Sequence, residues 1–217
     1  MTRDAVTPDL RPRRQDRFRV EIPEAECDGL RVERFEVVAH SLENLKLSME
    51  PGRRDCSPGW YTRLCTDRVL WMSDTDAEMS DHLTPFLEAR QRQARRVLVN
   101  GLGLGMIVKG LLTLDSVKHI DVVEADQRVI TLVGPSYDDP RVTVHHADAY
   151  EQATRWPAKS HWDVAWHDIW PTLCEDNLPE MARLHRSYGR RVSWQGSWGK
   201  ELLLAERRRT AGACWRS

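Results

Sequence analysis

Long hydrophobic runs and paired cysteines are both missing from this chain of 217 residues. No apolar run approaches the ~18 residues that a transmembrane helix needs. The Arg- and Pro-rich start also lacks the apolar segment of a signal peptide. The five cysteines are scattered, with no Cys-x-x-Cys pair and no zinc-ligand spacing. We therefore expect a cytoplasmic protein with reduced thiols, no metal-ligand set and no membrane partner.

An excess of charge of one sign is missing as well. The chain has 32 Lys and Arg against 33 Asp and Glu, which leaves a net charge of −1. A balance of this kind produces no global field that would attract nucleic acid. Hydrophobic residues make up 41% of the chain, which suits one globular domain with a small appendage. We predict a small-molecule substrate and no nucleic-acid partner.

The chain divides into three predicted parts: an irregular Arg- and Pro-rich lead-in over 1–29, a small β-region over 30–75, and an α/β domain over 76–217. Turn-forming residues separate the short runs of the β-region, which we expect to be antiparallel strands. These runs are 32–38, 42–49, 60–65 and 69–72. Thr75 and Glu78 fit a capping box for a helix that extends to about Arg92.

From Arg96 onward, strand and helix patterns alternate, which is typical of a parallel sheet with helices on its faces. We expect strands at 97–100, 118–124, 141–145, 162–168 and 190–195. Helices are expected at 104–114, 126–133, 148–154, 177–187 and 199–209. In such folds the ligand lies at the carboxyl ends of the strands.

A glycine turn follows the first of these strands. Residues 97–105 read Val-Leu-Val-Asn-Gly-Leu-Gly-Leu-Gly, with glycines at Gly101, Gly103 and Gly105. We expect this turn to present bare backbone N–H groups to an anionic ligand group. Met106 stands where a dinucleotide-binding G-x-G-x-x-G motif needs glycine. The G-x-G-x-G spacing instead resembles motif I of class I S-adenosylmethionine (SAM) dependent methyltransferases and spermidine synthases.

Acidic residues follow the next three strands. Glu124 ends the second strand, and a carboxylate there can accept both hydroxyls of a ribose or cap the next helix. We assign the ribose to Glu124 and the cap to Asp126. Asp148 and the Ala149 backbone suit adenine, although Asp148 also suits an N-cap. Asp168 ends the fourth strand, where it can orient or deprotonate a nucleophile, hold a divalent cation or cap a loop.

Histidine and tryptophan surround this last acid. His167 titrates near neutrality, and we expect it to assist Asp168. Trp162 and Trp166 share one face of a buried strand and are predicted to be core residues. Trp170, Trp194 and Trp198 lie at or beyond strand ends. There they form either aromatic walls for a substrate or a cover for the sheet.

Together, residues 97–170 look like the SAM-binding half of a class I methyltransferase. Residues 67–82, 97–105 and 121–129, with Asp168, are similar to the spermidine-synthase branch, so the resemblance covers about residues 60–170. It implies a Rossmann-like sheet preceded by a small β-region, with SAM as cofactor. The antiparallel sixth and seventh strands of that sheet have no counterpart here, which leaves an edge that a homo-oligomer could cover.

Three departures from the aminopropyl-transferring enzymes bear on function. Leu104 replaces the acid between the second and third glycines, Trp71 replaces a glutamine, and Asp81 replaces a histidine. The sequence also shows no set of carboxylates for two ammonium groups. We therefore expect SAM-dependent methyl transfer to a small or medium nucleophile. The alternatives are a spermidine-synthase-like aminopropyltransferase and a non-catalytic SAM-binding or scaffold protein.

Overall fold

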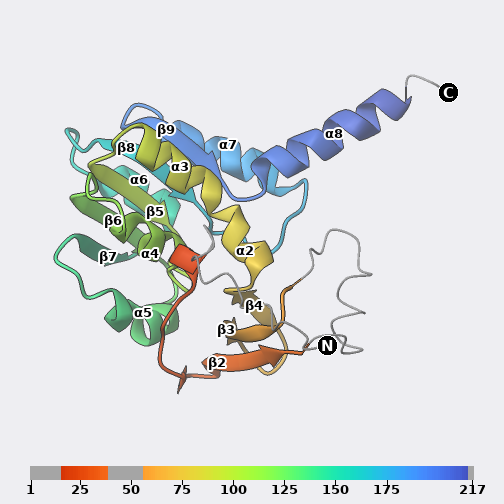
Figure 1. The fold of residues 1–217 in the computed structure, drawn as a ribbon. Coiled ribbons are helices and arrows are strands. Elements are labelled where there is room, and N and C mark those ends of the chain that lie inside the picture. The colour runs from red at the N-terminus through yellow and green to blue at the C-terminus, as the bar shows by residue number, and fades with distance from the viewer. Residues whose placement is uncertain (1–15, 39–55, 215–217) are drawn as a thin grey trace, which may run out of the picture.

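A computed structural model of the chain describes residues 16–38 and 56–214 (Figure 1). It contains a four-stranded sheet and a five-stranded sheet. The small sheet is antiparallel and follows chain order: β1 (Ala25–Cys27), β2 (Leu30–Val37), β3 (Gly59–Cys65) and β4 (Leu70–Ser73). The predicted β-region is therefore present. The strand expected over 42–49 lies outside the described residues.

The segment before this sheet is more ordered than expected. It contains a 3-10 helix, η1 (Asp16–Phe18), and strand β1. Phe18, Val20 and Ile22 are buried in the main hydrophobic core. The sequence predicts an irregular lead-in because these apolar residues are few and stand among charged ones. Their burial shows that residues 16–27 belong to the folded body.

The large sheet is parallel and has the order β7-β6-β5-β8-β9. Its strands are β5 (Arg96–Asn100), β6 (His119–Glu124), β7 (Val142–His146), β8 (Trp162–His167) and β9 (Val192–Ser197). This confirms the predicted Rossmann-like sheet of class I methyltransferases. No antiparallel closing strand occurs in the described part of the chain. The chain order reverses between β5 and β8, and open α/β sheets bind ligands at such a switch point.

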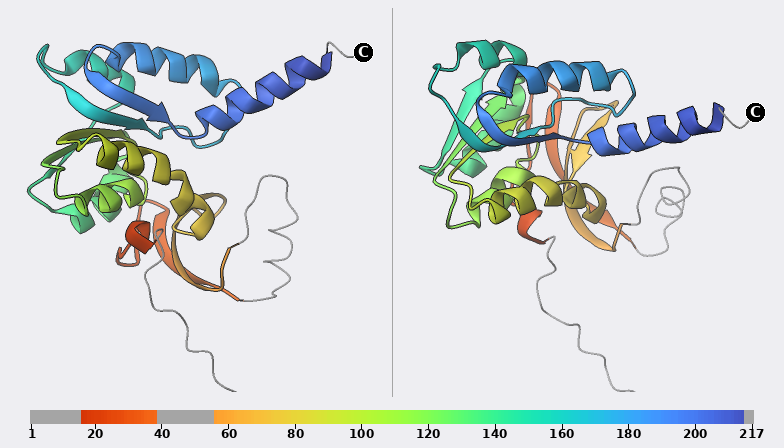
Figure 2. Two further views of the ribbon diagram at one scale, coloured as in Figure 1. Left: turned by 45° about the horizontal axis from the view of Figure 1, so that its top comes forward. Right: turned by 90° about the horizontal axis from the view of Figure 1, so that it is seen from above.

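Helices cover both faces of the large sheet. One face packs on α3, α4 and α5, and the other on α6 and α7. The bounds are α3 (Leu83–Gln91), α4 (Met106–Leu112), α5 (Gln127–Val133), η2 (Gly134–Tyr137), α6 (Ala149–Arg155) and α7 (Asn177–Tyr188). The last helix, α8 (Lys200–Cys214), extends away from the body in both views of Figure 2. None of the helices described is long and apolar enough to span a bilayer.

The helix expected to run to Arg92 is broken. The structure has α2 (Asp76–Asp81), then His82, then α3. Thr75 is the N-cap residue of α2, but its side chain makes no capping hydrogen bond. The Glu78 carboxylate instead accepts hydrogen bonds from the Ser73 backbone N–H (2.8 Å) and hydroxyl (2.5 Å). The capping-box prediction was therefore wrong, because Glu78 turns toward β4.

The turn from β5 into α4 meets the end of β8. Gly101 has φ +94°, and a Cβ atom there would overlap the backbone carbonyl oxygen of Asp168. The Asp168 N–H donates to the Asn100 carbonyl oxygen at 2.8 Å. The two strand ends are thus in direct backbone contact, which only glycine permits at position 101.

A buried carboxylate lies further back in the large sheet. Asp121 accepts hydrogen bonds from Trp162 Nε1 (2.8 Å), His145 Nε2 (3.0 Å) and His119 Nε2 (3.1 Å). Burial by itself raises the pKa of Asp121, but the hydrogen bonds from His145 and Trp162 outweigh it and hold the pKa below its usual range. Asp121 therefore stabilises the fold as an anion.

We expect Asp121→Asn to lower the free energy of unfolding by about 2–3 kcal/mol, because a buried charged acceptor loses its charge. A depressed pKa means that this contribution is present above pH ~4 and is lost as the pH falls further. Urea unfolding at pH 7 and pH 2 would measure both effects. The matched control, Asp139→Asn, breaks a more exposed ion pair with Arg141 and should cost less than about 1 kcal/mol. Equal losses in the two variants would contradict this role.

Gly101→Ala tests the contact between the strand ends. The new methyl group meets backbone rather than a flexible side chain, so we expect a loss of about 3 kcal/mol in the free energy of unfolding. Gly134 is the control, because its φ is −50° and a Cβ there meets only Ile130 Cγ2 at 3.7 Å. Gly134→Ala should be neutral or stabilise by up to about 1 kcal/mol. Thermal or urea unfolding would rank the two.

Candidate functional site

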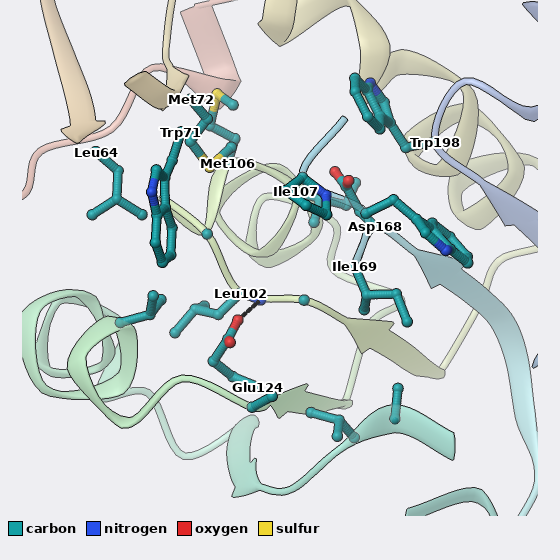
Figure 3. Close-up of a pocket in the computed structure, with 18 of the residues that line it drawn as sticks. Leu64, Trp71, Met72, Leu102, Met106, Ile107, Glu124, Asp168, Ile169 and Trp198 are labelled. Atoms are coloured by element: carbon teal, nitrogen blue, oxygen red, sulfur yellow. Dashed lines mark hydrogen bonds between the residues drawn. The ribbon is translucent and has the colours of Figure 1, made fainter. Parts of the chain in front are cut away.

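A cavity of about 540 Å³ opens at the switch point, between the small sheet and α2 on one side and the carboxyl ends of β5, β6, β7 and β8 on the other. Most of the residues singled out from the sequence line it (Figure 3). These are Gly101, Gly103, Glu124, Asp148, Ala149, Asp168, Trp170 and Trp198. The fold therefore brings the ends of four separate strands to one place.

Three of the predicted site residues do not line this cavity. His167 is fully buried, and its ring nitrogens contact Asn100 Nδ2 (2.7 Å) and Gln195 Oε1 (3.1 Å). Burial lowers the pKa of His167 to about 3. The structure thus holds His167 as a neutral packing residue and does not bring it to the Asp168 carboxylate. Gly105 lies against the Tyr137 ring, and Trp194 packs on the main core.

The glycine turn uses most of its own N–H groups. Gly101 donates to the Val123 carbonyl oxygen (2.8 Å), and Gly105 donates to the Leu102 carbonyl oxygen (2.7 Å). Leu102 donates to Glu124 Oε2 at 2.7 Å, and Leu104 to Met72 Sδ at 3.1 Å. The expectation that this turn presents bare backbone N–H groups to an anionic ligand was therefore wrong. A ligand carboxylate at this turn would find few backbone donors.

The acids expected to hold the nucleoside also stabilise the loops around them. Glu124 accepts from Leu102 and, through Oε1, from the Asp126 N–H at 2.8 Å. Asp148 caps α6 by accepting from the N–H groups of Tyr150 and Glu151. Both carboxylates still border the cavity, so their ribose and adenine contacts stay predictions. Asp126 caps α5, as expected.

A cluster of carboxylates surrounds Asp168. Glu78 and Asp81 line the same cavity, presented by the short helix α2. Burial, together with the smaller effect of the negative charges of Asp81, Glu78 and Glu124, raises the pKa of Asp168 to about 7. The sequence analysis found no such carboxylate set, and the structure corrects it. The missed signal is the acid spacing Asp76, Glu78, Asp81: we had assigned Glu78 to a capping box and had interpreted Asp81 only as the replacement of a histidine.

Two aromatic walls complete this end of the cavity. Trp198 Nε1 donates to Asp81 Oδ2 at 3.1 Å, which links the end of β9 to α2. Trp170 Nε1 donates to Glu180 Oε2 at 2.9 Å. Trp162 and Trp166 are buried, as expected for core residues. The Leu104 side chain is fully buried in the core and does not line the cavity.

The cavity is strongly acidic. Its described lining contains five carboxylates and no Lys or Arg: Glu78, Asp81, Glu124, Asp148 and Asp168. His82 lines it as well, and burial lowers the pKa of this imidazole to about 4, so it carries no charge at neutral pH. In the described residues no group of three or more His, Cys, Asp or Glu side chains is arranged to hold a metal ion. A cavity of this charge favours a cationic ligand.

Comparison with known proteins gives a consistent family. Residues 76–178 match the spermine/spermidine synthase domain. Polyamine aminopropyltransferases 1 and 2 of Ralstonia nicotianae are each 39% identical to this chain over 75 residues. The match covers 30% of this chain and only 14% of the length of either relative.

Solved structures of similar fold include spermidine synthase from Thermotoga maritima, at 19% identity and a TM-score of 0.47 over 79% of this chain and 52% of that one. A methyltransferase from Geobacter sulfurreducens has 18% identity and a TM-score of 0.38, over 52% of this chain and 54% of that one. The family match confirms the resemblance that the glycine turn and the acidic strand ends predict. Residues 76–178 are therefore similar to a spermine/spermidine synthase domain.

Proposed function

We propose that this protein transfers an aminopropyl group from decarboxylated SAM to an amine. The observation that carries the proposal is the cavity lining, whose described residues include five carboxylates and no Lys or Arg. Decarboxylated SAM carries a sulfonium and an ammonium group and no carboxylate. Ordinary SAM would place its own carboxylate beside these acids, where like charges repel.

The glycine turn supports the same choice of donor. Four of its five N–H groups already have acceptors within the protein. A SAM carboxylate would therefore be desolvated without enough hydrogen bonds to compensate. The donor is consumed in this reaction, so it is a substrate rather than the bound cofactor that the sequence analysis expected.

Asp168 has the environment of a proton acceptor. Its pKa of about 7 lies near the operating pH, which favours proton transfer. Asp168 first accepts a proton from the bound ammonium group, which frees the nitrogen lone pair. The nitrogen then attacks the propyl carbon bonded to the sulfonium, and an N–C bond forms as that C–S bond breaks. The electron pair stays on sulfur in 5′-methylthioadenosine, and the proton leaves through Asp168. Glu78 and Asp81 would hold the incoming amine as a cation beforehand.

The similarity to the two polyamine aminopropyltransferases of Ralstonia nicotianae supports this proposal over methyl transfer. One observation favours methyl transfer instead: Leu104 is buried and supplies no carboxylate at the glycine turn. Methyl transfer to a small nucleophile, our expectation from the sequence, is therefore kept as the second candidate. Under either activity the partner is a small molecule, and the exposed edge of the large sheet leaves room for a homo-oligomer.

A donor assay separates these candidates. The full chain is incubated with putrescine and either decarboxylated SAM or SAM, and products are followed by mass spectrometry. We expect an aminopropylated amine and 5′-methylthioadenosine from decarboxylated SAM only. Methylated product from SAM would favour the second candidate. Absence of turnover together with absence of nucleoside binding would indicate a non-catalytic protein.

Substitution of Asp168 tests its chemical role. Asp168→Asn keeps the shape of the side chain but cannot accept a proton, so we expect turnover to fall by about 10²–10⁴-fold. Binding of 5′-methylthioadenosine, measured by calorimetry, should change little. A parallel loss of nucleoside affinity would make Asp168 a binding residue.

The pH dependence follows from the raised pKa of Asp168. The active form is the carboxylate, so kcat/KM should rise with pH and level off above about 7. Asp81→Asn removes a negative charge beside Asp168, which lowers the pKa of Asp168 and should move the rise in kcat/KM to lower pH. The control Asp115→Asn changes an exposed acid outside the cavity and should leave this rise in place. A pH profile that is unchanged in Asp81→Asn would contradict the electrostatic coupling between Asp81 and Asp168.

A further inference from the structure

The end of the cavity away from Asp168 has an apolar roof. Val69, Leu70, Trp71 and Met72 are consecutive at the start of β4, and all four line the cavity. The first three are large hydrophobic side chains that stay exposed. Trp71 is the largest of them, with 41% of its surface accessible. An aromatic ring exposed inside a cavity can gain much apolar contact when a flat ligand covers it.

Arg128 holds this ring in place. Its guanidinium carbon lies 5.5 Å from the centroid of the Trp71 ring, within the range of a cation–π contact. The guanidinium is itself anchored, because it donates to Asp126 through Nε (3.0 Å) and Nη2 (2.6 Å). Its Nη1 donates to the Asp28 carbonyl oxygen, in the turn between β1 and β2, at 3.3 Å. Trp71 is therefore positioned from both sheets before any ligand arrives.

The neighbours of Trp71 are those expected of a nucleoside subsite. In Figure 3 the indole hangs from β4 into the cavity, across from Asp168 and Trp198, with Glu124 at the floor. Leu102, Ala125 and Val129 also line the cavity, so apart from Glu124 and Asp148, the two acids expected at the nucleoside, this side lacks the carboxylates that surround Asp168. The cavity is thus divided into a charged end for amines and a flat apolar end for an uncharged ring system.

We propose that Trp71, positioned by Arg128, packs on the nucleoside of the sulfonium donor and determines the affinity for it. This inference rests on the proposed function, because it takes the donor to be an adenosyl sulfonium. Trp71 then acts on binding of the nucleoside and leaves the proton transfer at Asp168 unchanged. Loss of the ring should weaken donor and product nucleoside alike.

Calorimetry with 5′-methylthioadenosine and the full chain tests this role. Trp71→Ala should weaken binding by about tenfold, and Trp71→Phe, which keeps an aromatic face, by less than about threefold. Arg128→Gln should weaken it by about threefold, since the ring keeps its size but loses its anchor. Circular dichroism would verify that each variant folds.

The small sheet contains a matched control. Trp60 on β3 is 54% exposed, with the Arg34 guanidinium 5.7 Å from its ring centroid, and it does not line this cavity. Trp60→Ala should bind the nucleoside as the wild-type chain does. Equal weakening in the Trp60 and Trp71 variants would overturn the proposal, because it would show a general effect on the sheet.

Two further outcomes separate this inference from the proposed function. If Glu124→Ala loses nucleoside binding while Trp71→Ala keeps it, the role of Trp71 is overturned and the proposed function stands. If the wild-type chain binds no 5′-methylthioadenosine, the proposed function and the role of Trp71 are both overturned.

Discussion

The backbone contact between the end of β5 and the end of β8 is the constraint on which the site depends. Gly101 leaves room for the Asp168 carbonyl, and the Asn100 carbonyl accepts the Asp168 N–H. These two strands flank the point where the chain order of the sheet reverses, so their contact sets where the cavity opens. It also places the Asp168 side chain beside the glycine turn. A side chain at position 101 would separate the strand ends and remove that alignment.

The acidic cluster depends on this arrangement and on α2. Glu78 and Asp81 come from a six-residue helix that ends at His82, and they reach the cavity because the helix breaks there. Ser73 donates hydrogen bonds to the Glu78 carboxylate and Trp198 to the Asp81 carboxylate, which holds both side chains in place. Like charges gathered in a lining whose described residues include no Lys or Arg make the empty cavity costly. A cationic ligand relieves that repulsion, so the charge of the lining favours cations whatever their shape.

Local patterns predicted the architecture well. The apolar runs at 97–100 and 162–168, and the glycines between 101 and 105, correspond to β5, β8 and the turn into α4. Contacts made at long range were harder to predict. The sequence cannot show that His167 points away from Asp168. Successive side chains of a strand point to opposite faces of the sheet, but which face each one takes depends on how the rest of the chain packs. It also placed Glu78 in a capping box, whereas Ser73 on β4 attracts that carboxylate.

The hydrogen bond from Trp198 to Asp81 joins residues that are 117 positions apart in the chain. A ribosome makes the helix that carries Asp81 long before it makes the end of β9. The acidic wall must therefore exist without its indole partner until β9 has been made, while the parallel sheet still lacks its edge strand. The nascent chain thus acquires the Trp71 side of the cavity first, and the acidic end is completed only after β9 and Trp198 have been translated.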